Sequence, residues 1–89
     1  MQTQTQTQQD ARIYKTADLY LGAYFSVAGV PIEEMVKKGR QVTMHFRDEG
    51  QIEELRQQYY NRKAKVGALA FTQEIQMLKK QIAEILSQD

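Results

Sequence analysis

Residues able to act as acids, bases, nucleophiles or metal ligands are few in this sequence. The single histidine is His45, and the chain contains no cysteine. A general base needs a neighbouring nucleophile or an orienting carboxylate, and the sequence shows no Ser/His/Asp arrangement. One histidine without cysteine also falls short of a common zinc site. The sequence therefore predicts no catalytic residue and no metal site, and we expect His45 to be an exposed strand residue.

Two adjacent pairs of carboxylates, Glu33-Glu34 and Glu53-Glu54, are the remaining candidates for metal or acid–base chemistry. Neighbouring side chains on a strand or a helix point in different directions, so we interpret both pairs as solubilising charge. The five glycines are dispersed along the chain and form no loop that would cradle a phosphate. We therefore expect a protein that is not an enzyme and that uses neither a cofactor nor a small-molecule substrate.

Basic side chains form a candidate nucleic-acid site. Between residues 37 and 65 the chain has eight basic residues and four acidic ones. Lysine and arginine contact phosphates, and tyrosine stacks on bases. The residues predicted for such a site are Lys37, Lys38, Arg40, Arg47, Arg62, Lys63, Lys65 and Tyr60. No helix-turn-helix spacing or RNA-recognition motif accompanies them, and the alternative is that they are ordinary solvated loop charges.

The stretch from Thr16 to Gly29 is the element around which these residues must be arranged. Thr16 is a suitable N-cap, Gly29 suits the left-handed residue after a helix, and Pro31 prevents continuation. Between them one apolar stripe recurs at helical spacing, formed by Ala17, Leu21, Tyr24, Phe25 and Ala28. The sequence therefore predicts a core helix, preceded by a short lead-in at 11–15 in which Tyr14 packs near Phe25.

A β-hairpin is predicted after this helix. From Val42 the chain alternates apolar and polar residues, which is typical of a half-buried strand. With a three-residue loop at 37–39, the residues Ile32, Glu34 and Val36 lie on the same face of the hairpin as Val42, Met44 and Phe46. A loop one residue shorter would instead pair Met35 with Val42 and expose Ile32. The first register buries more apolar surface and is the preferred one.

Two further helices complete the predicted order. The first of them has Asp48 as its predicted N-cap and Asn61 as its predicted C-cap in the left-handed conformation. Its inner apolar stripe consists of Ile52, Leu55 and Tyr59. The other runs from residue 67 or 68 to 86. Its apolar residues are spaced 4-3-4-3, as in a coiled-coil seam: Phe71, Ile75, Leu78, Ile82 and Ile85. This seam covers only about two heptads, so we expect it to seal the core of its own domain.

The predicted fold is a single small α+β domain over residues 11–89, with the order helix, β-hairpin, helix, helix. Residues 1–10 are a Gln/Thr repeat without apolar periodicity and are predicted to be a disordered tail. No apolar run approaches the ~20 residues that span a bilayer, so we expect a soluble cytoplasmic protein.

Self-association is a reasonable expectation for so small a domain without disulfides. The predicted interface residues are Tyr20, Ile75, Leu78, Ile82 and Ile85. Tyr20, Tyr60, Met35 and Met77 fall outside the main apolar stripes, and tyrosine and methionine bring adaptable apolar area to interfaces. We therefore slightly prefer a homo-oligomer over a monomer.

The run YKTADLYL from Tyr14 to Leu21, followed by Ala23-Tyr24 and Gly29, resembles a family of small bacterial and phage proteins of unknown function. Later positions agree with the same pattern: Phe46, Tyr59-Tyr60-Asn61, Val66, Ala68 and Leu78-Lys79. Arg62 departs from it, because a small residue, often glycine, is expected after the asparagine. The resemblance covers residues 14–86 and implies a compact domain in bacteria or their mobile elements. It implies no activity.

These observations favour a non-enzymatic accessory protein that acts as a protein-interaction or regulatory module. The formal net charge is only +1, and we therefore rank a protein partner, or a second copy of the chain, above nucleic acid.

Overall fold

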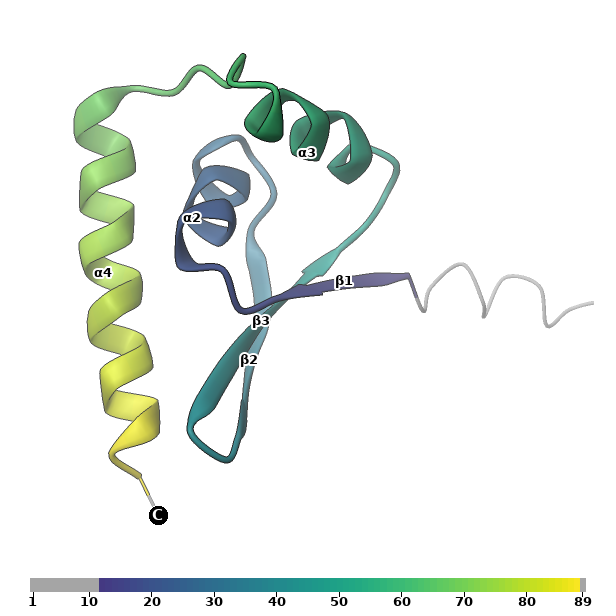
Figure 1. The fold of residues 1–89 in the computed structure, drawn as a ribbon. Coiled ribbons are helices and arrows are strands. Elements are labelled where there is room, and N and C mark those ends of the chain that lie inside the picture. Colours follow the sequence, from purple (N-terminus) through teal and green to yellow (C-terminus); the bar gives the residue numbers. More distant parts are fainter. Residues whose placement is uncertain (1–11, 89) are drawn as a thin grey trace, which may run out of the picture.

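The computed structural model describes residues 12–88, and the predicted tail at 1–10 lies outside them. The elements, shown in Figure 1, are β1 (Ile13–Thr16), α2 (Leu19–Val27), β2 (Ile32–Lys38), β3 (Gln41–Arg47), α3 (Ile52–Tyr60) and α4 (Ala68–Leu86). The α+β class is confirmed, and the three helices and the hairpin follow one another as predicted. The lead-in before the first helix is a third strand, which the predicted order lacked.

Strand β1 joins the sheet because β3 has a second edge to pair with. The strands are antiparallel in the order β1-β3-β2, and Tyr14 of β1 lies opposite Phe46 of β3. The backbone N–H of Asp48 donates to the carbonyl of Arg12 (3.1 Å), which extends this pairing by one step. The ring of Tyr14 meets the ring of Phe25 edge-on at 5.6 Å, so the predicted contact between the two is confirmed.

The hairpin register differs from both predicted registers. Lys38 pairs with Gln41 across a two-residue turn, where Gly39 has a φ of 63°, and Met35 pairs with Met44 rather than with Val42. A bulge between Ile32 and Glu34 brings Ile32 opposite Phe46. The preferred three-residue loop was wrong because the bulge, which strict alternation cannot foresee, places both Ile32 and Met35 on the inner face.

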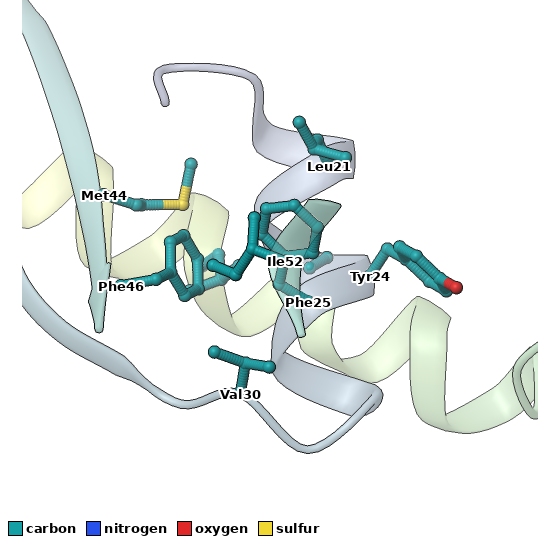
Figure 2. Packing of buried hydrophobic residues seen from close by; sticks show 9 residues of the cluster. Leu21, Tyr24, Phe25, Val30, Met44, Phe46 and Ile52 are labelled. Atoms are coloured by element: carbon teal, nitrogen blue, oxygen red, sulfur yellow. The ribbon is translucent and has the colours of Figure 1, made fainter. Parts of the chain in front are cut away.

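The core lies between the sheet and helix α2. Its buried side chains, most of them drawn in Figure 2, are Leu21, Ala23, Tyr24, Phe25, Val30, Met44, Phe46, Ile52 and Leu78. The Phe25 ring stands edge-on to Phe46 at 5.3 Å. Helix α2 can approach the sheet closely because Gly22 carries no Cβ where Met44 lies. This close approach makes α2 the central helix, as its apolar composition predicted.

Helix α2 begins two residues later than predicted. Thr16 belongs to β1, and its Oγ1 accepts a hydrogen bond from the N–H of Asp18 (3.0 Å). Asp18 is the N-cap, since its Oδ1 accepts from the N–H groups of Tyr20 (3.0 Å) and Leu21 (3.2 Å). Ala17 therefore precedes the helix, and Ala28 is its C-cap. The N-cap prediction for Thr16 was wrong because strand pairing holds Thr16 in the sheet.

Helix α3 also differs from prediction at its N-terminus. The N-cap is Gln51, whose side chain makes no capping hydrogen bond. Asp48, the predicted cap, instead accepts a hydrogen bond from the N–H of Gly50 (3.0 Å). Gly50 has a φ of 105°, so a tight turn separates Asp48 from the helix. The Asp48 prediction was wrong because the carboxylate closes this turn rather than the helix end.

Helices α2 and α3 end in the same backbone motif. After α2, Gly29 has a φ of 106° and donates to Ser26 (3.2 Å), and Val30 donates to Phe25 (2.9 Å). After α3 the equivalent left-handed residue is Arg62, with a φ of 62°. Its N–H and that of Lys63 donate to the carbonyls of Tyr59 (3.2 Å) and Gln58 (2.8 Å), which completes a second Schellman motif. Gly29 is confirmed as the residue ending α2.

The prediction for the end of α3 missed by one residue. Asn61 has a φ of −89° and is the C-cap, so the left-handed residue is the one after it. In the resembled family's pattern this is the position where a small residue was expected. Arg62 therefore occupies a backbone conformation that suits glycine.

Replacing Arg62 with glycine is expected to stabilise the domain. A left-handed L-residue is strained by about 1 kcal/mol, and glycine removes that strain at some cost in unfolded-chain entropy. We expect the free energy of unfolding in urea to rise by roughly 0.5 kcal/mol for Arg62→Gly relative to Arg62→Ala. The alanine variant removes the same charge and keeps Cβ. Equal stability of the two variants would contradict the prediction.

Candidate interaction groove

Helix α4 is twice as long as the helix it packs against, and this mismatch creates the site. α4 has 19 residues and α2 has nine, which correspond to about 28 Å and 14 Å of helix. Phe71, Ile75 and Leu78, all within the first eleven residues of α4, pack on the core. The C-terminal part continues past α2 and runs beside the hairpin of β2 and β3 (Figure 1). One side of this part of α4 is therefore not covered by another helix.

A groove of about 480 Å³ lies between α4 and β2. Its apolar lining comes from both walls and consists of Pro31, Ile32, Met35, Met77, Leu78 and Ile85. Met77 is 47% exposed, although it is a large apolar side chain. Leu78 is buried and belongs to the floor, whereas Ile85 and Met35 are half-buried. The groove therefore presents apolar surface that the domain's own core does not cover.

Four glutamates also line the groove: Glu33, Glu34, Glu74 and Glu84. No lysine or arginine is among its lining residues. Glu74 accepts a hydrogen bond from the Ser26 hydroxyl (2.8 Å), and Glu33 forms a two-point ion pair with Arg47 (3.0 and 3.2 Å). Glu34 is the strand partner of His45, and its carboxylate lies 3.9 Å from His45 Nδ1, on the sheet face opposite the core. The groove thus has an apolar floor, and Glu84 is an exposed carboxylate on its α4 wall.

The strand wall of the groove is an edge of the sheet. In the part of the chain that the structure describes, β2 pairs with β3 alone, so its other edge has no strand partner and borders the groove. This edge carries a bulge at its start and the charged residues Glu33, Glu34, Lys37 and Lys38. Bulges and charges are features by which proteins discourage the addition of another strand at an edge.

The predicted nucleic-acid residues fall into separate groups. Lys37, Lys38 and Arg40 gather at the hairpin turn, whereas Arg62, Lys63 and Lys65 lie in the connector between α3 and α4. Figure 1 places the turn and the connector at opposite ends of the molecule. Arg47 pairs with Glu33, and the Lys37 Nζ donates to the carbonyl of Gln88 (2.6 Å). The two basic groups therefore do not form one face.

Tyr60 belongs to an aromatic cluster next to the basic connector. Its ring is 58% exposed, meets Tyr59 edge-on at 5.2 Å, and lies 5.8 Å from the Arg56 guanidinium. Tyr59 in turn stacks on Tyr24 of α2 at 5.7 Å. The pKa of Arg56 is raised above its ordinary value, chiefly by the charge of Tyr14 and then by the hydrogen bond with Glu53. The cluster joins α3 to α2 while leaving Tyr60 accessible.

Burial raises the pKa of the Tyr59 phenol, and the carboxylate of Asp18 adds to the effect. Ionising Tyr59 therefore costs more free energy in the folded state than in the unfolded state. The resulting contribution to the free energy of unfolding is fully present below the ordinary tyrosine pKa of about 10, and it is lost as the pH rises through the raised pKa. We expect Tyr59→Phe to lose less stability than the wild type between about pH 9 and pH 11, measured by urea unfolding. Parallel losses in the two proteins would contradict this prediction.

The predicted interface residues are distributed between the core and the groove. Leu78 is buried in the core and Ile75 packs against it, while Tyr20 is exposed on α2. Ile82 is half-buried, and Ile85 lines the groove. The groove itself was not foreseen, because its two walls come from α4 and β2 and are brought together only by packing. Met77 was recognised as falling outside the stripes, which is the signal that pointed to this surface. Met35, also expected outside them, lies on the inner face opposite Met44 and packs against the core.

His45 lies on the sheet face opposite the core, as its strand position predicted, but its side chain is only 15% exposed. Its Nδ1 is 3.9 Å from Glu34, and its strand partner in β1 is Lys15. Among residues 12–88, no three His, Cys, Asp or Glu side chains are grouped so that they could hold a metal ion. Within the same residues, no helix has the length and apolar character needed to cross a membrane.

Comparison with protein families gives a match over most of the chain. A family model described as a domain of unknown function (DUF5659) matches residues 11–84. No curated protein and no solved structure matches the chain significantly. The match covers most of the chain, including all six elements of the fold except the last turn of α4.

Proposed function

Since the chain belongs to the DUF5659 family, which carries no assigned activity, we propose from its own geometry that it is a non-enzymatic protein-binding module. In this proposal it holds a segment of another protein in the groove between α4 and β2. The observation that carries the proposal is the apolar floor of the groove, of which Met77 is the most exposed member.

The shape of the groove favours a protein segment over a small molecule. Its lining on α4 extends from Glu74 to Ile85, which corresponds to roughly 17 Å of helix. Small-molecule sites are concave and bury most of their ligand, whereas this groove is a trough bounded by one helix and one strand edge. Methionine side chains adapt to varied apolar partners, and two of them line the trough.

The proposed setting is that of an accessory or regulatory protein in bacteria or their mobile elements. This setting is supported by the resemblance of the YKTADLYL run and the later matching positions. A second copy of the chain remains one of the protein partners that the test below must distinguish.

The test uses peptides selected from a random display library against the wild-type protein. We expect the selected peptides to bind Met77→Arg at least about tenfold more weakly, because a charged side chain would occupy the apolar floor. Leu69→Arg is the matched control, since Leu69 is a 69% exposed apolar residue of the same helix outside the groove. Equal binding to both variants would refute the groove as the binding site.

Sedimentation of the wild type and Met77→Arg over a range of concentrations identifies self-association. A dimer that is lost in Met77→Arg and kept in Leu69→Arg would make a second copy the partner. A wild-type monomer at all concentrations would assign the groove to a different protein.

Single-stranded nucleic acid is the second candidate partner, and a specific arrangement favours it. Exposed Tyr60 lies beside Arg56, and the connector with Arg62, Lys63 and Lys65 follows α3 directly. An aromatic ring beside basic side chains is the arrangement that single-strand binding proteins use. It ranks second because the basic residues of the hairpin turn lie at the other end of the molecule.

Fluorescence anisotropy of labelled single- and double-stranded oligonucleotides at two salt concentrations tests this alternative. We expect any binding through phosphate contacts to weaken steeply with salt and to be lost in Arg62→Glu/Lys63→Glu. The absence of binding at low salt would remove the alternative.

A further inference from the structure

We propose that the outer edge of β1 pairs with β1 of a second copy of the chain, so that two three-stranded sheets join into one. This interface goes beyond the proposed function, because β1 and the groove lie at opposite edges of the sheet, whose strand order is β1-β3-β2. Two properties of β1 carry the proposal: the direction of its outer backbone groups and their fit to a second copy.

The backbone groups that face outward belong to Ile13 and Lys15. In an antiparallel pair, hydrogen-bonded and non-hydrogen-bonded residues alternate along each strand. The bond from the N–H of Asp48 to the carbonyl of Arg12 fixes this alternation, and it turns the backbone groups of Tyr14 toward β3. The N–H and C=O groups of Ile13 and Lys15 therefore point away from β3. In the described part of the chain, no strand lies on that side of β1.

Two copies of β1 satisfy these groups best in one symmetric register. With Tyr14 on the twofold axis, Ile13 of each copy lies opposite Lys15 of the other, and the two pairs form backbone hydrogen bonds in both directions. Centring the pairing on Lys15 would place two ammonium groups opposite each other, which destabilises a sheet. Centring it on Ile13 would leave Lys15 opposite residue 11, which precedes the strand. The register centred on Tyr14 is therefore favoured.

The side chains also fit in this register. Ile13 is 37% exposed on the outer face of the sheet, and the aliphatic stem of the other copy's Lys15 would cover it. On the inner face, Tyr14 would lie directly opposite its own copy, and aromatic pairs across strands stabilise a sheet. The formal net charge of +1 causes little repulsion between two copies.

The β1 edge suits an added strand better than the β2 edge does. Strand β2 carries a bulge and the charged residues of its sequence IEEMVKK, which oppose such an addition. Strand β1 pairs with β3 in regular register, and its charged residue is Lys15. Because β1 has 4 residues, the contact is small, and small interfaces are weak. We therefore expect the dimer to form between roughly 10 µM and 1 mM protein.

Sedimentation equilibrium over this concentration range tests the interface. We expect Ile13→Lys to dimerise at least about tenfold more weakly than the wild type, because its new ammonium group would face Lys15 of the other copy. Ile13→Lys/Lys15→Glu should recover the dimer, since each lysine then faces a glutamate. Leu69→Lys is the matched control, because it adds the same charge at a 69% exposed residue of α4 and should dimerise like the wild type.

Amide hydrogen exchange followed by NMR locates the contact on β1. The amides of Ile13 and Lys15 should exchange rapidly in dilute protein and more slowly as the dimer fraction rises. The amides of Tyr14 and Thr16 face β3, so they should be protected at every concentration and serve as the internal control. Thermal melts of the variants verify that each is folded.

The outcomes separate this interface from the groove. A dimer that persists in Met77→Arg and is weakened in Ile13→Lys supports pairing through β1. A dimer that is lost in Met77→Arg and kept in Ile13→Lys would place the second copy in the groove and refute the inference. A wild-type monomer up to about 1 mM, or equal weakening by Ile13→Lys and Leu69→Lys, would also refute it. Exchange at Ile13 and Lys15 that does not change with concentration would do the same.

Discussion

Replacement of Phe46 by alanine is expected to leave the domain largely unfolded in water at room temperature. Phe46 is fully buried in the central strand, opposite Tyr14 of β1 and Ile32 of β2, with the Phe25 ring edge-on at 5.3 Å. Truncating a buried phenylalanine to alanine costs about 3–5 kcal/mol. A single core in a chain of this size supplies roughly that much net stability. The substitution therefore removes about as much free energy as the fold has.

Circular dichroism and urea unfolding measure this effect. The expected result is the loss of the cooperative transition, with residual signal only from transient helix. Met77→Ala is the control, because Met77 is half-exposed in the groove and its truncation should change the free energy of unfolding by about 0.5 kcal/mol or less. A cooperative Phe46→Ala transition with a loss below about 1.5 kcal/mol would show that the core is not centred on this residue.

Replacement of Gly22 by alanine is expected to destabilise the domain, although alanine is the better helix former. In an exposed helix the change from glycine to alanine gains about 1 kcal/mol. At Gly22 an added Cβ would lie 2.5 Å from Sδ and 2.8 Å from Cε of Met44. Met44 is fully buried among other core side chains, so overpacking should cost about 1–3 kcal/mol. The net loss should be about 1 kcal/mol, and at most about 2 kcal/mol.

A double-mutant cycle isolates the contact between Gly22 and Met44. In a Met44→Ala background the clash is absent, so Gly22→Ala should be neutral or stabilising by up to about 1 kcal/mol. The coupling free energy from urea unfolding of the four proteins should then reach about 2 kcal/mol. If Gly22→Ala is equally unfavourable in both backgrounds, the contact with Met44 is not the cause. Met44→Ala must itself remain folded, which its own transition shows.

The ends of two helices could be predicted from local patterns in the sequence, and the composition showed that familiar catalytic and metal-binding motifs are lacking. Gly29 and Pro31 mark the end of α2, and the 4-3-4-3 spacing of apolar residues gave α4 its observed limits at 68–86. Caps and helical periodicity depend on residues within about four positions of one another, and they can be read without knowing the fold. The lone His45 and the missing cysteine are likewise properties of composition.

Other features depended on residues that are distant in the sequence. Strand β1 forms because it can pair with the free edge of β3. This pairing holds Thr16 in the sheet, so the N-cap of α2 is Asp18 rather than the predicted Thr16. The hairpin register places Met35 of β2 opposite Met44 and Ile32 opposite Phe46, and the bulge between Ile32 and Glu34 allows both pairings. Strand pairing is decided by burial across the whole sheet, so the alternation within one strand left two registers open and neither was right.

The groove is the clearest product of tertiary structure. Met35 and Ile85 are separated by fifty positions and line the same groove only because α4 extends beyond α2 and runs beside β2. The sequence alone established which side chains are acidic, apolar or basic, and it identified Met77 as falling outside the core stripes. Packing then divided the basic residues between two ends of the molecule and gathered acidic and apolar ones into one trough. Such groupings follow from the relative placement of whole elements, which no local pattern encodes.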